Sequence, residues 1–202
     1  RRRIGEMIVL DAAQRTGRAF SVVRFGNVLG SRGSVVLLFR RQIDSGGPVT
    51  VTHPEMERYF MTIPEAVHLV LQAFAMGAGG DVYVLNMGKQ IRILDLAQDL
   101  IRLSGLEPGT DIEIVFTGIR PGEKLSEALW DEGADYQPTG HPDILRLDED
   151  ELLRGQPLVD AIVALVKAAS SGDMERIVHL LNNYVPNATV STAPTTDLTA
   201  LI

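Results

Sequence analysis

Apolar residues recur at helical spacing in six stretches of this chain, and the stretches between them hold shorter apolar runs. Helices are predicted where apolar positions fall three or four residues apart on one face. By this criterion the sequence predicts helices over residues 3–15, 35–43, 62–77, 93–103, 157–169 and 173–184. Compact apolar or alternating runs that end near glycine, proline or asparagine favour strands. They lie at residues 19–24, 48–52, 82–85 and 112–116.

Strands and helices alternate over residues 17–127, an order typical of an α/β layer rather than a helical bundle. After residue 130 the pattern changes. Residues 131–141 resemble a loop, and the acidic run 148–151 is interpreted as the exposed start of a helix. The last residues are rich in Thr, Ala and Pro and have few apolar positions, which predicts disorder. We therefore divide the chain into residues 1–130, a helical extension over 131–186 and a disordered tail over 187–202.

The composition narrows the class of protein. The 202 residues are 45% hydrophobic and 22% charged, which is ordinary for a soluble globular protein. The net charge of −7 argues against a nucleic-acid partner, because such proteins usually carry a basic face. The chain has no cysteine, which excludes disulfides and cysteine-rich zinc sites. No apolar run approaches the roughly 18–20 residues that span a bilayer, and no two histidines have metal-ligand spacing. We therefore expect neither membrane contact by this segment nor a bound metal.

A glycine-punctuated loop, R-F-G-N-V-L-G-S-R-G-S over residues 24–34, follows the first predicted strand. Glycines let backbone N–H groups approach a ligand closely. Asn27 offers both a donor and an acceptor, and Arg32 adds an anion donor. The same pattern also fits a flexible strand-to-helix connection, and the spacing alone leaves both interpretations open.

Arg58 lies just before the predicted helix that Thr62 begins with a capping box. Its guanidinium group has the shape and charge to bind a phosphate. The alternative is a surface ion pair with Glu55 or Glu57, which would contribute only about 0–1 kcal/mol.

Arg120 and Glu123 flank a Pro-Gly turn directly after the predicted strand at residues 112–116. An arginine fork suits a phosphate, and a carboxylate suits a pair of sugar hydroxyls. Ligands of open α/β sheets bind beyond strand ends. The alternative is a turn held by a salt bridge. We interpret the pair as half of a nucleotide-sugar site.

Together these clusters resemble the carboxy-terminal part of polysaccharide-biosynthesis nucleotide-sugar 4,6-dehydratases, the CapD-like branch of the extended short-chain dehydrogenase/reductases. The resemblance covers about residues 3–130, in the family's order, and it extends to the late segment L-L-N-N-Y-V-P at residues 180–186. The matching motifs are R-I-G-E-M (3–7), V-R-F-G-N-V-L-G-S-R-G-S-V (23–35), V-T-V-T-H-P-E-M (49–56), R-Y-F-M-T-I-P-E-A (58–66), M-G (87–88) and R-P-G-E-K-L (120–125).

The resemblance implies a partial Rossmann-like sheet with a small α/β substrate lobe and C-terminal helices. It also implies roles for residues in a UDP-sugar site. Asn27 would bond the nucleotide-sugar, Arg58 and Arg120 would clamp its diphosphate, and Glu123 would take the ribose hydroxyls. Val28 would lie near the nicotinamide of NADP or NAD. Arg32 is a secondary phosphate candidate, and the strand at residues 49–52 would border the uridine.

The implied parent enzyme oxidises C4 of a UDP-N-acetylhexosamine, removes water across C5–C6 and returns hydride to C6. A nucleotide-sugar 4-epimerase and a UDP-sugar-binding module without turnover are the alternatives. The family's cofactor-phosphate glycines and catalytic acid/base residues are not in this sequence, and its catalytic lysine aligns with Arg2. We therefore expect the chain alone to be inactive. We expect a cytoplasmic location, with the parent enzyme anchored at the inner face of the membrane. We also expect the chain to pair with itself or with an amino-terminal half.

Overall fold

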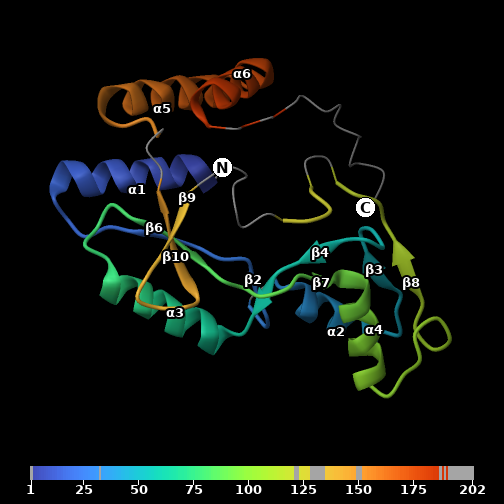
Figure 1. Cartoon of the computed structure of the whole chain (residues 1–202). Helices are drawn as coiled ribbons and strands as arrows, with labels where there is room; N and C mark the ends of the chain where they lie inside the picture. Colours follow the sequence, from blue (N-terminus) through green and yellow to red (C-terminus); the bar gives the residue numbers. More distant parts are fainter. Residues whose placement is uncertain are drawn as a thin grey trace.

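The structure is a computed structural model that describes residues 2–31, 33–120, 123–127, 135–148, 152–186, 188 and 190. Figure 1 shows two lobes side by side, with a pair of helices above the first lobe. Each lobe has its own cluster of buried apolar side chains. The α/β prediction is confirmed, because strands and helices alternate through both lobes.

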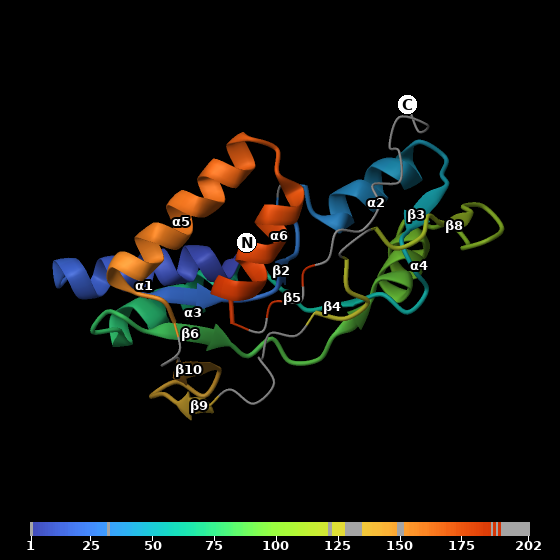
Figure 2. The same cartoon turned by 90° about the horizontal axis from the view of Figure 1, so that it is seen from above.

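A four-stranded sheet forms the centre of the first lobe, in the order β1 (Val22–Arg24), β6 (Val82–Leu85), β10 (Ile144–Asp148) and β9 (Asp135–Pro138). β1 and β6 run parallel, whereas β10 is antiparallel to both of its neighbours. All four residues of β6 are buried, as expected for a central strand with both faces covered. Helices α1 (Arg2–Thr16) and α3 (Ile63–Met76) lie on opposite faces of this sheet (Figures 1 and 2).

Helix α3 begins with the predicted capping box. The Thr62 hydroxyl accepts from the Glu65 backbone N–H, and a Glu65 oxygen accepts from the Thr62 backbone N–H at 2.7 Å. The Thr62 side chain and then its backbone N–H hold the pKa of Glu65 below the ordinary carboxyl value. The cap fixes where the helix starts, and so fixes how the preceding residues 57–61 enter it.

The second lobe is built from α2 (Val35–Asp44) and α4 (Ile93–Leu103), which pack on the parallel pair β3 (Val49–Val51) and β8 (Ile114–Phe116). Phe39, Ala97 and Ile101 are fully buried at the centre of this lobe. Each helix therefore directs one apolar stripe at the strands, as the helical spacing in the sequence predicts.

Two pairs of two-residue strands connect the lobes. β2 (Asn27–Val28) runs parallel to β5 (Phe60–Met61), and β4 (Glu57–Arg58) runs antiparallel to β7 (Ile91–Arg92). These strands place Asn27 and Arg58, which are 31 positions apart in the chain, on neighbouring short ladders.

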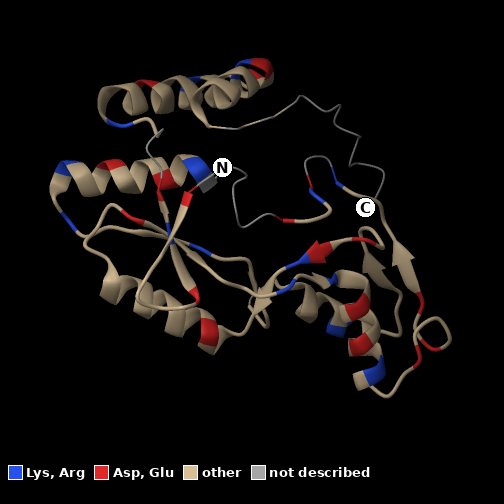
Figure 3. Cartoon of the chain, viewed as in Figure 1, with Lys and Arg blue, Asp and Glu red and all other residues tan. Residues whose placement is uncertain are grey.

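The last two helices, α5 (Gly155–Ser170) and α6 (Met174–Tyr184), form a hairpin over α1 (Figure 2). The Asp11 carboxylate of α1 accepts a hydrogen bond of 2.6 Å from the Gly155 backbone N–H, and Arg154 donates to Gln14 at 3.3 Å. Figure 3 shows charged residues of both signs spread over both lobes and these helices.

The later residues differ from the prediction in two places. A loop is predicted over residues 131–141, but Asp135–Pro138 form strand β9. A helix start is predicted at Asp148, but this residue ends strand β10. Asp148, the first residue of the acidic run 148–151, therefore belongs to the sheet, and residues 149–151 lie outside the described part of the chain. Of the predicted tail 187–202 only Ala188 and Val190 are described, and the Val190 backbone exchanges two hydrogen bonds with the Asn182 side chain. The division at residues 130 and 186 stays a prediction.

Candidate functional site

Arg58 lies on β4, which is bounded on one side by β7 and on the other by residues 123–127. The Glu57 backbone N–H donates to the Leu125 carbonyl at 2.9 Å, and Glu57 forms a parallel bridge with Ser126. This contact carries the segment that follows the Pro-Gly turn back to Arg58, across more than sixty positions of sequence.

Gln90, which directly precedes strand β7, holds the same segment in place. The Ser126 hydroxyl donates to the Gln90 side-chain oxygen at 2.8 Å, and the Gln90 side-chain nitrogen donates to the Glu127 carbonyl at 3.3 Å. Strand β4, which carries Arg58, therefore lies between β7 and a segment that is itself bonded to Gln90.

The Arg58 guanidinium group is nearly buried and surrounded by acceptors. Its Nη1 donates to the carbonyls of Glu57 at 2.7 Å and Leu125 at 2.9 Å. Its Nη2 donates to the Glu123 carboxylate at 3.4 Å, and its Nε lies 3.6 Å from the Glu127 carboxylate. A guanidinium group has five N–H donors. Both Nη1 donors, one Nη2 donor and the Nε donor of Arg58 face the four acceptors just named, and the second Nη2 donor faces none of them. The predicted alternative, pairing with Glu55 or Glu57 side chains, is not what these contacts show.

Glu123 joins the two arginines of the predicted site. One carboxylate oxygen faces Arg58, and the other accepts from the Arg120 backbone N–H at 3.4 Å. The Glu123 backbone N–H in turn donates to the Arg120 carbonyl at 3.0 Å, which closes the turn. The Arg120 side chain is exposed, and Pro121 and Gly122 lie outside the described residues. The structure thus brings the Arg58 side chain and the Arg120 backbone to the Glu123 carboxylate.

Asn27 and Val28 lie on the next ladder. The Asn27 backbone N–H donates to the Tyr59 carbonyl at 3.0 Å, and Val28 is in register with Met61. Both residues are partly buried. Arg32, the remaining predicted phosphate ligand, lies outside the described residues and stays a prediction.

The structure gives a steric reason for glycine at position 26, whereas the sequence suggested close approach of a ligand. A Cβ built on it would lie 2.9 Å from the Tyr59 Cβ and 3.4 Å from the Met87 sulfur. Its backbone N–H also contacts that sulfur at 2.8 Å. The glycine therefore permits close packing of two protein segments, and not the approach of a ligand.

We expect Gly26→Ala to destabilise the chain by about 1–3 kcal/mol, the usual range for overpacking, because the new methyl group would separate β2 from β5. Chemical denaturation measures this cost. Gly5→Ala is the matched control, since a Cβ at that helical position would meet nothing within 4 Å and alanine favours a helix interior. Equal stability of the two variants would contradict this account of Gly26.

A paired contact that sequence reasoning missed lies beside this loop. Arg24, at the end of β1, donates from Nε and Nη2 to the two Glu6 oxygens at 2.8 and 2.7 Å. Glu6 is only 7% exposed and belongs to α1. This two-pronged ion pair joins the helix to the strand from which the Asn27 loop departs. The sequence signal was present, because both residues fall inside the quoted motifs R-I-G-E-M and V-R-F-G-N.

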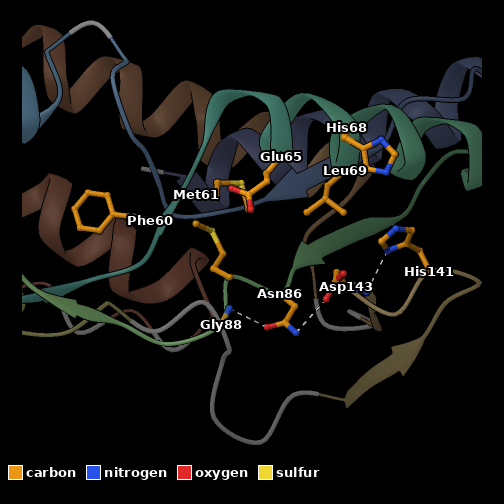
Figure 4. Close-up of a pocket in the computed structure, with 10 residues that line it drawn as sticks. Phe60, Met61, Glu65, His68, Leu69, Asn86, Gly88, His141 and Asp143 are labelled. Carbon is orange, nitrogen blue, oxygen red and sulfur yellow. Dashed lines mark hydrogen bonds between the residues drawn. The ribbon is translucent and has the colours of Figure 1, made fainter.

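A pocket of about 480 Å³ lies near the end of β6. Figure 4 shows His68 and Glu65 on α3, Asn86 and Gly88 after β6, and His141 and Asp143 on the turn between β9 and β10. Phe60, Met61, Leu69 and Met87 supply its apolar lining. Asn27, Arg58, Arg120 and Glu123 are not among the residues that line it. Two of its apolar residues, Phe60 and Met61, lie on β5 in register with Asn27 and Val28.

Within the described ranges, no group of three or more histidine, cysteine or acidic side chains is placed to hold a metal ion. Among the helices that the structure describes, none combines the length and the apolar character needed to cross a membrane.

Two solved structures share much of this fold. The chain of DesIV from Streptomyces venezuelae, a dTDP-glucose 4,6-dehydratase with NAD and TYD bound, matches with a TM-score of 0.52 at 20% identity over 60% of this chain and 38% of that one. Pen from Bacillus thuringiensis matches with a TM-score of 0.62 at 32% identity over 74% of this chain and 46% of that one. The fold is therefore Rossmann-like, as predicted.

The chain belongs to the polysaccharide biosynthesis protein family, whose sequence profile matches residues 1–149. It is 54% identical to the capsular polysaccharide biosynthesis protein CapD of Staphylococcus aureus, over 80% of this chain and 27% of CapD. It is 56% identical to the probable polysaccharide biosynthesis protein EpsC of Bacillus subtilis, over 63% of this chain and 21% of EpsC. The chain thus spans about a quarter of the length of these relatives.

Proposed function

We propose that this chain is the nucleotide-sugar-binding part of a UDP-N-acetylhexosamine 4,6-dehydratase that acts in polysaccharide biosynthesis. The observation that carries the proposal is the convergence of Arg58, Arg120 and Glu123, which come from two segments more than sixty positions apart. The Arg58 guanidinium group beside the Glu123 carboxylate, with the exposed Arg120 side chain on the same turn, matches a ligand that carries a diphosphate and a hydroxyl-rich sugar. The 54% identity to CapD supports the polysaccharide context.

The contacts suggest different roles for the two arginines. The exposed Arg120 side chain has its guanidinium fork available for two phosphate oxygens. Arg58 offers one Nη2 donor while its other donors face Glu57, Leu125, Glu123 and Glu127. Arg58 therefore contributes one hydrogen bond and a positive charge, and Arg120 contributes the two-pronged contact. Glu123 holds one oxygen toward Arg58 and keeps acceptor capacity for a ribose hydroxyl.

Among the described residues, those of β2 suit the nicotinamide end of a cofactor. Val28 and Asn27 are partly buried beside β5 and present an apolar surface next to an amide. Gly26 is packed against protein, so it is no cradle for the cofactor's phosphates. NAD or NADP, when bound, would accept hydride from sugar C4 and return it at C6. Asn27 would orient the sugar, and Val28 would exclude water from the nicotinamide face.

A 4-epimerase is the second candidate, because the chain is 42% identical to the UDP-glucose 4-epimerase of Rickettsia canadensis over 54% of its length. Product analysis on the full-length parent with UDP-N-acetylglucosamine and NAD or NADP separates the two. A 4-keto-6-deoxy sugar nucleotide supports the dehydratase, whereas a hexose inverted at C4 supports the epimerase. Binding of the nucleotide-sugar with no conversion would leave a binding module.

Removing the Glu127 carboxylate is expected to strengthen UDP binding about three- to tenfold. Glu127 faces the Arg58 Nε at 3.6 Å and is about one-third exposed, so it competes with an incoming diphosphate for the same charge. Calorimetric titration of Glu127→Ala with UDP measures the change. Glu113→Ala removes an exposed carboxylate of the second lobe and serves as the control for net charge. Weaker UDP binding by Glu127→Ala would show that this carboxylate instead holds Arg58 in its binding geometry.

A further inference from the structure

The pocket beside α3 has polar groups that the proposed nucleotide-sugar site does not use. It lies between the first turns of α3, the loop after β6 and the turn joining β9 to β10 (Figure 4). Its volume of about 480 Å³ falls within the range typical of small-molecule sites. The residues that line it come from four chain segments, because Phe60 and Met61 of β5 also face it.

His141 presents a donor to the pocket. Its Nδ1 accepts a hydrogen bond of 3.1 Å from the Asp143 backbone N–H, so the neutral ring carries its proton on Nε2. The ring of His68 lies across from it, with ring centroids 6.1 Å apart and an angle of 65° between the planes. Two imidazoles from different elements therefore meet at one end of the pocket, as Figure 4 shows.

Asp143 and Asn86 supply fixed acceptors and a donor. The Asn86 side-chain oxygen accepts from the Gly88 backbone N–H at 3.1 Å, which orients its amide. The amide nitrogen then reaches one Asp143 oxygen at 3.5 Å. The second Asp143 oxygen keeps acceptor capacity for a ligand, and its neighbour His141 adds an N–H.

This lining selects a class of ligand. None of the described side chains that line the pocket is a lysine or arginine, and two of them, Glu65 and Asp143, are carboxylates. An anion would therefore meet unfavourable charge. An ammonium group has only donors, so it could not accept from the His141 Nε2–H and would leave that donor unpaired. A hydroxyl group both donates and accepts, so it can satisfy Asp143 and His141 at once.

The rest of the lining is apolar. Phe60, Met61, Leu69 and Met87 give the pocket a face that can cover C–H groups. A pyranose ring has this combination, with hydroxyls at its edge and C–H groups on its faces. We propose that the pocket binds an uncharged hexose unit of a carbohydrate, with Asp143 and His141 holding its hydroxyls. This site goes beyond the nucleotide-sugar site and does not depend on it.

The test is a saturation-transfer NMR titration of the full chain with N-acetylglucosamine. We expect binding by the wild type and an affinity about tenfold lower in Asp143→Asn, the loss of one charge-assisted hydrogen bond. Asp99→Asn, on an exposed face of α4, should bind as the wild type does. His141→Ala should also lose affinity, whereas His179→Ala on α6 should not.

Three results would overturn the proposal: no binding of N-acetylglucosamine by the folded chain, equal binding by Asp143→Asn and Asp99→Asn, or stronger binding of inorganic phosphate or spermidine than of the sugar at the same residues. Circular dichroism of each variant verifies folding. A parallel UDP titration separates the two sites, because Asp143→Asn should leave UDP affinity unchanged. Loss of UDP binding with sugar binding retained would count against the proposed function alone.

Discussion

Replacing Glu6 with leucine is expected to destabilise the chain by about 3–5 kcal/mol, the cost of removing one partner from a buried ion pair. The Arg24 guanidinium makes two bonds of 2.7 and 2.8 Å to this carboxylate, and its side chain is 14% exposed. Without Glu6 a positive charge would stay in a poorly solvated position at the end of β1. Urea denaturation monitored by circular dichroism measures the difference in unfolding free energy.

Two variants show whether the charge, and not the volume, causes the loss. The double variant Glu6→Leu/Arg24→Leu removes both charges of this pair and should recover part of the stability. Arg3, whose Nη1 lies 3.8 Å from the Glu6 carboxylate, keeps its charge in both variants. Asp99→Ala breaks an exposed ion pair, in which the Asp99 side chain is 69% exposed and the Arg102 side chain 54% exposed. It should change stability by about 0.5 kcal/mol or less. If Glu6→Leu cost no more than Asp99→Ala, the ion pair would not hold α1 to β1.

Arg120→Ala is expected to weaken UDP-sugar binding by about 2–4 kcal/mol, as loss of a charge-assisted contact to phosphate does. Arg120 carries this effect because Arg58 has most of its donors facing protein acceptors. Unfolding free energy should change little, because the Arg120 side chain is exposed. Calorimetry with UDP-N-acetylglucosamine measures the affinity.

Arg102→Ala is the matched control for Arg120→Ala. Arg102 is an exposed arginine at the end of α4, paired with Asp99 at 3.3 Å and remote from the 123–127 segment in sequence. Its removal changes the net charge by the same amount. Equal affinities of the two variants for UDP-N-acetylglucosamine would remove Arg120 from the phosphate site.

Elements with strong local signals were predicted well from the sequence. The strand 82–85 and the helix 93–103 have the predicted bounds, because each is a clear apolar pattern that ends close to a glycine. The capping box at Thr62 was also readable, since it needs only residues three positions apart. Local chemistry decides these elements, so a sequence window is enough to find them.

Elements that exist only through tertiary pairing were missed. The two-residue strands β2 and β5 have too few residues for any periodicity, and each depends on the other. Strand β10 carries the apolar residues Ile144, Leu145 and Leu147 without strict alternation, and the acidic residues after it favoured a helix start. β9 contains Pro138 and polar residues and becomes a strand because β10 lies beside it.

The candidate site shows the same division. The sequence placed Arg58 and Glu123 at chemically suitable positions, but their contact spans 65 positions and no local pattern reports it. It gave no hint of Glu127 as a partner of Arg58. Glu6 and Arg24 both fall inside the quoted motifs, but no local pattern pairs two residues 18 positions apart. It also offered the ligand explanation for Gly26, where the structure shows a steric one.

We propose that Arg58, Arg120 and Glu123 form one binding site for the diphosphate and ribose of a nucleotide-sugar. A crystal structure of the chain with UDP-N-acetylglucosamine would decide this. We expect the diphosphate against the Arg120 guanidinium and the Arg58 Nη2, with a ribose hydroxyl on Glu123. If the diphosphate were bound elsewhere and these three side chains made no contact with the ligand, they would not form the site.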